Sequence, residues 1–336
     1  MKKAKIGLLG TGRLGFVHGE NMQYRIPNID LVMVCDANQE SADRAAKALD
    51  TKVCYDFEEM LSNDEVEGVA IVSSSSMHCQ HIKMAMEAGK HVFVEKPVST
   101  SASELPIIYE AVSSRPQQVF MCGYHKRYDE EYRYVVDKIK EGLIGEPTLA
   151  KCTNRDPEAP PIEYMANGAG IFFDLCVHEF DVARWFLGSD PDTMYASGGV
   201  YVYDFMKQYD DIDCATVSMK MQNGTLALLD VSRNANYGCH IHEEVFGTDG
   251  CIQVGTIDKN TCIIYKDKKK YTETGPWFLQ KFAKAYRNEL EEFAQHILDG
   301  TYPEATVVDA IRVSQMAIVA KKSYDLGQPV KFDGTI

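Results

Sequence analysis

The sequence predicts an α/β protein in which a doubly wound parallel sheet is followed by an α+β domain with a large, mostly antiparallel sheet. In the first 122 residues, short apolar segments alternate with segments of helical periodicity, which is typical of a parallel sheet with helices on both faces. A G-x-G-x-x-G sequence directly follows the first apolar segment. Beyond residue 123, several segments have apolar residues at every second position, which indicates antiparallel strands.

The 336 residues are enough for two domains, each with its own core. We expect the first domain to span residues 1–122 and the second to span residues 123–336. In the first domain, strands are expected near residues 6–9, 31–35, 53–55, 68–72, 91–94 and 119–122. Helices are expected at residues 15–23, 39–49, 57–62, 79–88 and 102–113.

The loop between the first strand and the first helix carries a dinucleotide-binding pattern. Gly10 permits a tight turn, Gly12 lets the backbone approach a pyrophosphate, and Gly15 lets the helix pack close to the strand. The phosphates would then lie at a helix N-terminus, where free N–H groups and the helix dipole favour an anion. The pattern predicts a Rossmann domain that binds its cofactor through Gly10, Thr11, Gly12, Arg13, Leu14 and Gly15.

An acidic residue ends the second predicted strand. Asp36 lies about twenty residues beyond the last glycine, where a carboxylate that binds the adenosine ribose is expected. Its charge would accept a hydrogen bond from a 2′-hydroxyl and repel a 2′-phosphate, and no arginine follows at Ala37 or Asn38 to bind a phosphate. The cofactor is therefore predicted to be NAD rather than NADP. Asp36 could also cap the helix at residues 39–49, and the two roles are compatible.

Two further strand ends carry polar residues that would face the cofactor, because ligands bind at the carboxyl ends of the strands in such sheets. Ser74 and His78 follow the strand at residues 68–72, and Glu95 and Lys96 follow the strand at residues 91–94. The ammonium of Lys96 can hold a substrate hydroxyl or assist its deprotonation. For Lys96, the alternative is an exposed Lys-Pro turn. For the strand end at residue 72, the alternative is that Ser76 caps the next helix.

The second half of the chain mixes helices with strands. Helices are expected at residues 129–141, 174–187, 277–299 and 306–326. Segments of period two lie at residues 215–221, 225–231, 242–247, 251–255 and 262–266, and Asn223-Gly224 is a typical hairpin sequence. These features predict an α+β domain with a largely antiparallel sheet.

Asp174 and His178 lie four residues apart at the start of a predicted helix, so both side chains would project from one face. A histidine can accept a proton near neutral pH, and a neighbouring carboxylate raises its basicity and orients it. Oxidation of an alcohol needs such a base, because the hydroxyl proton leaves as hydride is transferred. The alternative is a chance helix pair. Arg127 and Asp156, which follow predicted strands, are either ligand contacts or members of ion pairs.

Composition argues against several classes of function. The formal net charge of −14 disfavours non-specific nucleic-acid binding. No apolar run approaches a membrane span and no signal-peptide core follows the first residues, which predicts a cytoplasmic protein. The ten cysteines include no C-x-x-C pair, so buried thiols are expected rather than disulfides or a zinc site. His240 and His242 share a strand face near acidic residues, but strand histidines are usually structural, so no metal site is predicted.

Together these motifs resemble the Gfo/Idh/MocA oxidoreductase family over nearly the whole chain, through the glycine loop, Asp36, Glu95-Lys96-Pro97 and Asp174-x-x-x-His178. Within that family, residues 155–161, 170–174 and 178–181 are similar to those of inositol 2-dehydrogenases. The resemblance implies NAD-dependent oxidation of a ring hydroxyl to a ketone. It also implies a homotetramer, a catalytic group of Lys96, Asp174 and His178, and further substrate contacts from Arg127, Asp156 and Tyr237.

We therefore expect an NAD-dependent dehydrogenase that acts on a CH–OH group of a cyclic polyol. Oxidation of myo-inositol at its 2-hydroxyl, with His178 as the base, is the leading interpretation. The first alternative is another sugar or polyol dehydrogenase of the same family, acting on scyllo-inositol or a glucose-type substrate. The second is a non-catalytic NAD(H) sensor, which would bind NAD without turning over any polyol. The expected partner is a small molecule, with neither nucleic acid nor membrane.

Overall fold

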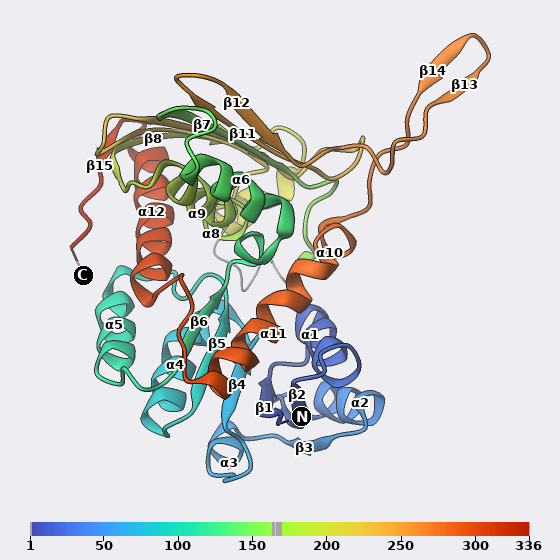
Figure 1. Cartoon of the computed structure of the whole chain (residues 1–336), viewed down its shortest axis with the longest axis vertical. Coiled ribbons are helices and arrows are strands. Elements are labelled where there is room, and N and C mark those ends of the chain that lie inside the picture. Colours follow the sequence, from blue (N-terminus) through green and yellow to red (C-terminus); the bar gives the residue numbers. More distant parts are fainter. Residues whose placement is uncertain (1, 163–164, 166–169, 336) are drawn as a thin grey trace. The chain divides into compact units, whose positions relative to one another are not determined.

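The computed structural model describes residues 2–162, 165 and 170–335 (Figure 1). Contacts within the chain divide it into two compact units. The first unit contains residues up to 125 together with 285–314, and the second contains residues 126–284 together with 315–335. Residues 285–314, which the sequence analysis assigns to the second domain, thus cluster with the first unit.

The first unit is built on a parallel sheet of six strands. Its strand order is β3-β2-β1-β4-β5-β6, so the order reverses between β1 and β4, where such sheets bind ligands. All six predicted strands are confirmed, with ends that differ from the prediction by at most two residues. The strands are β1 (Ala4–Leu9), β2 (Ile29–Cys35), β3 (Lys52–Cys54), β4 (Gly68–Ile71), β5 (His91–Glu95) and β6 (Phe120–Gly123).

Helices connect these strands, as the alternating pattern predicts. Their starts have local causes: the Asn38 side chain accepts the N–H of Ser41 ahead of α2, and the Asp56 side chain accepts the N–H of Glu58 ahead of α3. The helical segments are α1 (Arg13–Tyr24), α2 (Gln39–Leu49), α3 (Phe57–Leu61), η1 (Ser75–Met77), α4 (His78–Glu87), η2 (Ala102–Glu104) and α5 (Leu105–Ser113). The strands between them are almost entirely buried, as expected for a parallel sheet covered on both faces.

A helix from the C-terminal part of the sequence completes the first unit. This helix, α11 (Ala283–Asp299), packs its Phe293 ring at 6.0 Å from that of Phe93 on β5. The side chain of Asn28 donates to the carbonyl oxygen of Glu291 at 3.1 Å. The buried face of α11 is mainly apolar but includes Glu289, a residue type that is rarely buried without a partner.

The second unit contains a sheet of seven strands in the order β12-β11-β7-β10-β9-β8-β15. β7 and β10 pair in parallel and the other neighbours are antiparallel, which confirms a mostly antiparallel sheet. Burial alternates along β9, so one face of this strand is in the core. The strands are β7 (Pro147–Arg155), β8 (Pro191–Gly199), β9 (Cys214–Met221), β10 (Leu226–Ser232), β11 (His240–Gly247), β12 (Cys251–Val254) and β15 (Val330–Lys331).

Helices of the second unit lie on one face of its sheet (Figure 1). α6 (Glu130–Lys140) contacts α9 (Cys176–Leu187), and α9 contacts β7 and β10. The single helix predicted at residues 174–187 is in fact two, because α8 (Ile171–Asp174) precedes α9. The predicted helix at 277–299 is likewise divided between α10 (Phe278–Lys281) and α11. The remaining helical segments are η3 (His125–Tyr128), η4 (Asp204–Tyr209) and α12 (Val307–Leu326).

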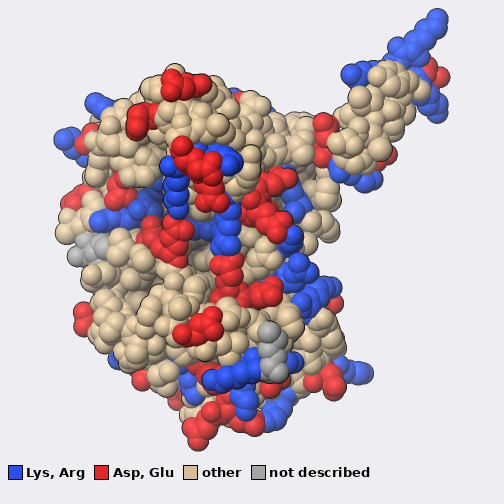
Figure 2. Space-filling model, in the orientation of Figure 1, with Lys and Arg blue, Asp and Glu red and all other residues tan. Residues whose placement is uncertain are grey.

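β13 (Ile264–Lys266) and β14 (Lys269–Tyr271) form a separate hairpin that projects from the second unit (Figure 1). Exposed Lys266, Lys268, Lys269 and Lys270 surround its turn, and Figure 2 shows this end of the hairpin as mainly basic. None of the helices in the described part of the chain combines the length and the apolar content that a bilayer crossing requires.

Candidate active site

The turn after β1 requires glycine at two positions. Gly10 has a φ of +95°, and a Cβ atom there would lie 2.5 Å from the carbonyl oxygen of Val72. A Cβ atom at Gly15 would lie 2.1 Å from the carbonyl oxygen of Gly10, so a larger residue would push α1 away from β1. Around Gly12, by contrast, a Cβ atom would meet no atom within 4 Å. This open space beside the backbone is where a pyrophosphate would fit.

The start of α1 is suited to an anion. Its N-cap residue is Gly12, which offers no side-chain cap, and its first turn contains no acidic residue. The N–H groups of the first turn are therefore available, and the helix dipole adds to their attraction for phosphate. Arg13 is exposed and Leu14 is half-buried in the same turn. These features fit the cofactor that the glycine pattern predicts.

The carboxylate of Asp36 is held by the loop ahead of α1. Its Oδ2 accepts the N–H of Thr11 at 2.8 Å and the hydroxyl of Thr11 at 2.9 Å, and its Oδ1 accepts the N–H of Asn38 at 2.9 Å. Thr11 is buried and braces Asp36, whose half-exposed carboxylate retains lone pairs for a ribose hydroxyl. The helix-capping role considered for Asp36 belongs instead to Asn38, whose side chain accepts the N–H of Ser41 at 3.0 Å.

His78 ties the loop after β4 to the loop after β5. Its Nδ1 lies 2.7 Å from the carbonyl oxygen of Pro97, and its Nε2 lies 3.0 Å from that of Ser73. Burial lowers the pKa of the His78 imidazole, while the two carbonyl oxygens act in the opposite direction. Ser74 is exposed beside this brace. The α4 helix starts without a side-chain cap, so the serine cap considered for it is absent. Direct cofactor contacts of Ser74 and His78 stay predictions.

Glu95 and Lys96, which end β5, have different surroundings. Glu95 is buried, with its Oε1 at 2.7 Å from Nε2 of His18, while its Oε2 accepts the N–H of Lys96 at 3.2 Å. Lys96 is half-buried and precedes a cis peptide bond to Pro97. The Glu95 side chain is thus part of the core of the first unit, and its predicted cofactor contact stays a prediction.

In the second unit, a buried arginine anchors Asp174. Arg233, which follows β10, is 1% exposed. Its Nη2 donates to Oδ2 of Asp174 at 3.0 Å, and its Nη1 donates to Asp211. Asp211 in turn accepts the N–H of Ile171 at 2.8 Å. Ile171 begins α8 and Asp174 ends it. The guanidinium of Arg233 therefore holds one end of this short helix directly, through Asp174, and the other end through Asp211. No local sequence pattern marks either Arg233 or Asp211 as part of a site.

His178 lies in the first turn of α9 and is half-buried. Its N–H donates to the carbonyl oxygen of Leu175 at 3.2 Å. Leu175 separates α8 from α9 and has φ −90° and ψ −51°, so the backbone stays close to helical between Asp174 and His178. The two residues of the D-x-x-x-H motif therefore lie in successive turns, although on two helices rather than one.

Arg127 forms a buried bidentate ion pair with Asp181. Its Nε and Nη2 donate to the two carboxylate oxygens at 2.7 and 2.6 Å. The guanidinium carbon also lies 5.5 Å from the ring centre of Trp185. These contacts give Arg127 a structural role, because a buried bidentate ion pair stabilises the second unit. A contact between Arg127 and substrate stays a prediction.

Asp156 follows β7, whose end lies beside the end of β10, which Arg233 follows. Its N–H donates to the carbonyl oxygen of Ser232 at 2.8 Å, one residue before Arg233. The neighbouring Arg155 donates to the hydroxyl of Tyr237 at 3.0 Å, and Tyr237 is 43% exposed. Asp156 therefore lies close to Arg233, which anchors Asp174, and Arg155 holds the hydroxyl of Tyr237. Their roles in substrate binding stay predictions.

A buried polar network in the second unit is also absent from the sequence analysis. Nζ of Lys126 donates to Glu179 at 2.7 Å and to Glu243 at 2.5 Å, and the hydroxyl of Tyr132 donates to the other oxygen of Glu243. Burial alone would lower the pKa of Lys126, but the attraction of the two carboxylates outweighs it and raises the pKa. The network joins η3, α6, α9 and β11, and no local sequence pattern marks it.

The histidines considered as metal ligands are held by other groups. Nδ1 of His242 lies 3.1 Å from the carbonyl oxygen of Gly255, and Nδ1 of His240 lies 3.4 Å from the hydroxyl of Tyr237. Among residues 2–162, 165 and 170–335, the one group with metal-ligating atoms close together lies in the first unit. It consists of His18, Glu95 and Glu289, with ligand atoms within 4.8 Å of one another.

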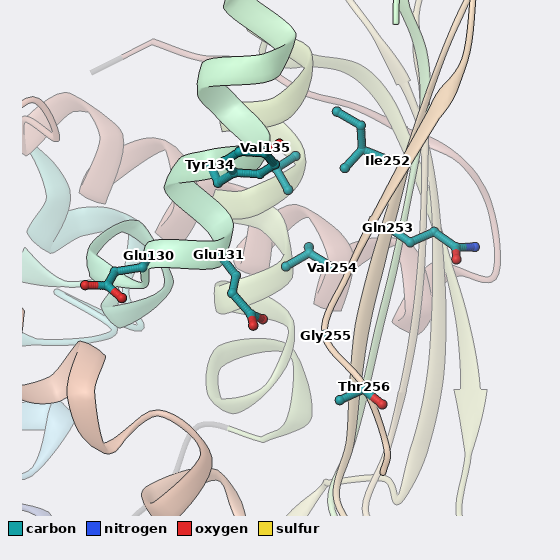
Figure 3. A pocket seen from close by; sticks show the side chains of 9 residues that line it. All are labelled: Glu130, Glu131, Tyr134, Val135, Ile252, Gln253, Val254, Gly255 and Thr256. Atoms are coloured by element: carbon teal, nitrogen blue, oxygen red, sulfur yellow. The ribbon is translucent and has the colours of Figure 1, made fainter. Parts of the chain in front are cut away.

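A hollow of about 460 Å³ lies between α6 and the β12 edge of the second unit (Figure 3). Apolar side chains of Val135, Ile252 and Val254 line it, and Glu131 lies at its edge. Its lining, as far as the described residues define it, includes no predicted site residue. The hollow therefore does not bear on the predicted chemistry.

Comparisons with known proteins agree with this arrangement. Residues 4–124 match the family described as "Oxidoreductase family, NAD-binding Rossmann fold", and residues 132–253 match the "GFO/IDH/MocA C-terminal domain". The scyllo-inositol 2-dehydrogenase (NAD(+)) of Bacillus subtilis is 33% identical over 98% of this chain and 97% of that protein. The myo-inositol 2-dehydrogenase of Thermotoga maritima is 28% identical over 99% of both chains.

A solved structure has the same fold. The scyllo-inositol dehydrogenase from Lactobacillus casei, with bound cofactor NAD(H) and scyllo-inositol, superposes with a TM-score of 0.94 at 28% identity, covering 98% of this chain and 99% of that one. The two matched regions together span more than half of the sequence. With the geometry of the glycine loop and Asp36, they show that the chain belongs to the Gfo/Idh/MocA oxidoreductase family and is an NAD-dependent oxidoreductase with a Rossmann domain.

Proposed function

We propose that this enzyme oxidises a CH–OH group of an inositol ring to a ketone, with NAD as the hydride acceptor. The first candidate substrate is myo-inositol, oxidised at its 2-hydroxyl. Relatives that span nearly the whole chain and are named as inositol dehydrogenases support the substrate class. The two protein units supply different parts: the glycine loop and Asp36 would hold NAD, and residues of the second unit would hold the polyol.

The anchoring of Asp174 by Arg233 carries the proposal. A carboxylate in a chance helix pair would need no buried partner, whereas this one is fixed at the end of α8, one turn before His178. A fixed carboxylate close to a histidine suits general base catalysis, because geometry must be held before proton transfer is efficient. The half-buried state of both side chains leaves them accessible to a ligand.

We assign roles to the chain's own groups as follows. His178 takes the proton of the reacting hydroxyl, and Asp174 orients His178 and stabilises its charged form. The Lys96 ammonium binds the same hydroxyl or a neighbouring one and lowers the free energy of the developing alkoxide. Arg127, Asp156 and Tyr237 are assigned to the remaining hydroxyl groups. When bound, NAD supplies the hydride acceptor.

scyllo-Inositol is the second candidate, because the relative that is 33% identical and the superposed Lactobacillus casei enzyme are both named for it. myo- and scyllo-Inositol differ in configuration at a single ring carbon. Oxidation at that carbon removes the difference, so both polyols yield the same ketone. The choice between them therefore depends on the orientation of one hydroxyl group in the site. The homotetramer and the cytoplasmic location expected from the sequence are part of this proposal.

The deciding experiment follows NADH formation with myo-inositol, scyllo-inositol and glucose in parallel, with NAD and then with NADP. Turnover of an inositol with NAD supports the proposal, and turnover of glucose alone would move the enzyme to another substrate group. The reverse reaction separates the two inositols: NADH and the shared ketone are supplied, and the polyol formed is identified by NMR. Tight NAD binding with no turnover of any polyol would favour the sensor alternative.

The base assignment has its own test. His178→Ala should lower kcat by roughly 10²–10⁴-fold while the Kd for NAD stays unchanged. His296→Ala is the control, because this histidine lies on α11 and its Nδ1 is 2.8 Å from the hydroxyl of Thr301. Normal turnover in the His178 variant would remove this residue from the mechanism.

A further inference from the structure

Three titratable side chains are buried together beneath the end of β5. They are His18 on α1, Glu95 on β5 and Glu289 on α11, with exposures of 0%, 5% and 0%. Each residue has one nitrogen or oxygen atom that lies within 4.8 Å of the corresponding atoms of the other two. Two ionised carboxylates in such a place would repel each other and lack hydration, which is strongly unfavourable. One of the two must therefore be neutralised.

His18 does not supply the missing positive charge. Its Nε2 lies 2.7 Å from Oε1 of Glu95, so a hydrogen bond joins them. Its buried Nδ1 has no hydrogen-bond partner among the described residues. A charged imidazolium would leave an N–H buried without an acceptor at that atom, whereas a neutral ring with its proton on Nε2 leaves only a lone pair. We therefore assign a neutral ring that donates from Nε2 to an ionised Glu95.

Glu289 has the properties of a neutral acid. Within residues 2–162, 165 and 170–335, neither of its carboxyl oxygens has a hydrogen-bond partner, and both are buried. Burial, and then the negative charge of Glu95, raise the pKa of Glu289 well above its usual range. A protonated carboxyl group carries one donor, and the ionised Glu95 is an acceptor within 4.8 Å of it in the cluster. The gap of up to 4.8 Å is one that a single bridging water can span.

We propose that Glu289 is a neutral carboxylic acid that shares its proton with Glu95 through one bridging water and thereby positions Lys96. Glu95 also accepts the main-chain N–H of Lys96 at 3.2 Å, so its carboxylate links α1 and α11 to the first residue after β5. The neighbouring Gly123 on β6 leaves room for it, since a Cβ atom there would lie 3.2 Å from the carboxyl carbon of Glu95. Glu289 is a positioning residue, and the inference rests on the proposed function only for the role of Lys96.

A shared proton fits the geometry better than a metal ion does. Two ligands of one tetrahedral zinc ion lie about 3.3 Å apart, given metal–ligand distances of about 2.0–2.1 Å. The 2.7 Å between His18 and Glu95 is instead a hydrogen-bond distance. Two further titratable side chains lie beside this cluster: the ring of Tyr286 is 5.8 Å from that of His18, and the ring of His125 stacks on Tyr286 at 4.7 Å.

The first test measures the melting temperature from about pH 5 to about pH 8. The pKa of Glu289 is higher in the folded chain than in the unfolded one, so wild-type stability falls as pH rises above the unfolded value of about 4.3. Glu289→Gln keeps a neutral donor but cannot titrate. It should therefore melt above the wild type by at least roughly 2–4 °C near pH 8, with a smaller difference near pH 5.

Glu291→Gln is the matched control, because it removes the same charge from a half-buried position on α11. It should show no such pH-dependent gain. Equal melting curves for Glu289→Gln and wild type across the pH range would overturn the neutral-acid assignment. A rise in the melting temperature of the wild type, but not of Glu289→Gln, on addition of Zn²⁺ would replace the shared proton with a metal site.

The second test separates positioning from simple packing. Glu289→Leu fills the space but removes the donor, and it should lower kcat by about 10–100-fold with the Kd for NAD unchanged. Glu289→Gln should restore most of that activity. Equal losses in both variants, or no loss in either, would end the positioning role. If the wild type oxidises no inositol, the proposed function fails while the melting experiment still decides the state of Glu289.

Discussion

Replacing Arg233 with methionine should weaken the second unit measurably. The arginine is 1% exposed, and its partners Asp211 and Asp174 have side chains that are 5% and 20% exposed. Breaking a buried ion pair by removing one partner costs about 3–5 kcal/mol. Asp211 keeps two backbone donors, Ile171 N–H and Ile212 N–H, both at 2.8 Å, and Asp174 is partly hydrated. We therefore expect the lower end, about 3 kcal/mol, which corresponds to a fall in Tm of about 6–12 °C at about 2–4 °C per kcal/mol.

The same substitution should also reduce turnover. Asp174 would lose the donor that holds it at the end of α8, and small displacements of a catalytic group can cost about 100-fold in rate. We expect kcat with an inositol to fall by about 10–100-fold. The Kd for NAD should not change, because the glycine loop and Asp36 belong to the other unit. Steady-state kinetics and NAD titration measure the two effects separately.

Two control variants sharpen this experiment. Arg233→Lys keeps the charge but replaces the planar fork, in which Nη1 and Nη2 each contact one carboxylate, with a single nitrogen, so its Tm should be intermediate. Lys207→Met removes a charge from an exposed pair with Asp204 and should leave the Tm close to that of the wild type. If Arg233→Met had the same Tm and kcat as the wild type, the anchoring role of Arg233 would be refuted.

The remaining predictions concern the buried lysine and the glycine loop. Lys126→Met should cost about 3–5 kcal/mol, because Glu179 and Glu243 would be left buried without a cation. The deficit should shrink in acid, because burial raises the pKa of Glu179 and lets it take up a proton, and melts at several pH values would show this. Gly10→Ala should lower apo stability by about 1–3 kcal/mol through its positive φ and the 2.5 Å approach to Val72. Gly12→Ala, which meets no protein atom within 4 Å, should leave apo stability unchanged and weaken NAD binding, and melts with NAD titrations separate the two.

The parallel sheet and its cofactor loop could be predicted because their signals are local. Each strand of the first unit is a short apolar run, and the glycines of the loop follow the first run at a fixed spacing. The same holds for Asp36, which follows its strand directly. Local rules were less reliable where two interpretations compete within a turn: Asn38, not Asp36, caps α2. The helix predicted at 174–187 likewise breaks after Asp174.

The partners of the chemical groups could not be predicted, because they come from distant parts of the chain. His18 and Glu95 are 77 residues apart, and Asp174 and Arg233 are 59 apart. A buried arginine or glutamate has no periodic signature, and its energetic effect depends on which opposite charge or donor the fold brings beside it. The assignment of residues 285–314 to the first unit is of the same kind, since it depends on the packing of α11 against β5.

The sequence by itself predicted the fold class, an NAD-binding Rossmann domain and the candidate site residues Lys96, Asp174 and His178, because backbone periodicity and motif spacing are properties of neighbouring residues. Only the tertiary structure decided that Arg233 holds Asp174, that Lys126 pairs with two glutamates, and that Glu289 lies near Glu95. The physical reason is that the cost of burying a charge is set by everything within a few ångströms of it in space. The number of residues between two groups along the chain says almost nothing about whether they lie that close in space.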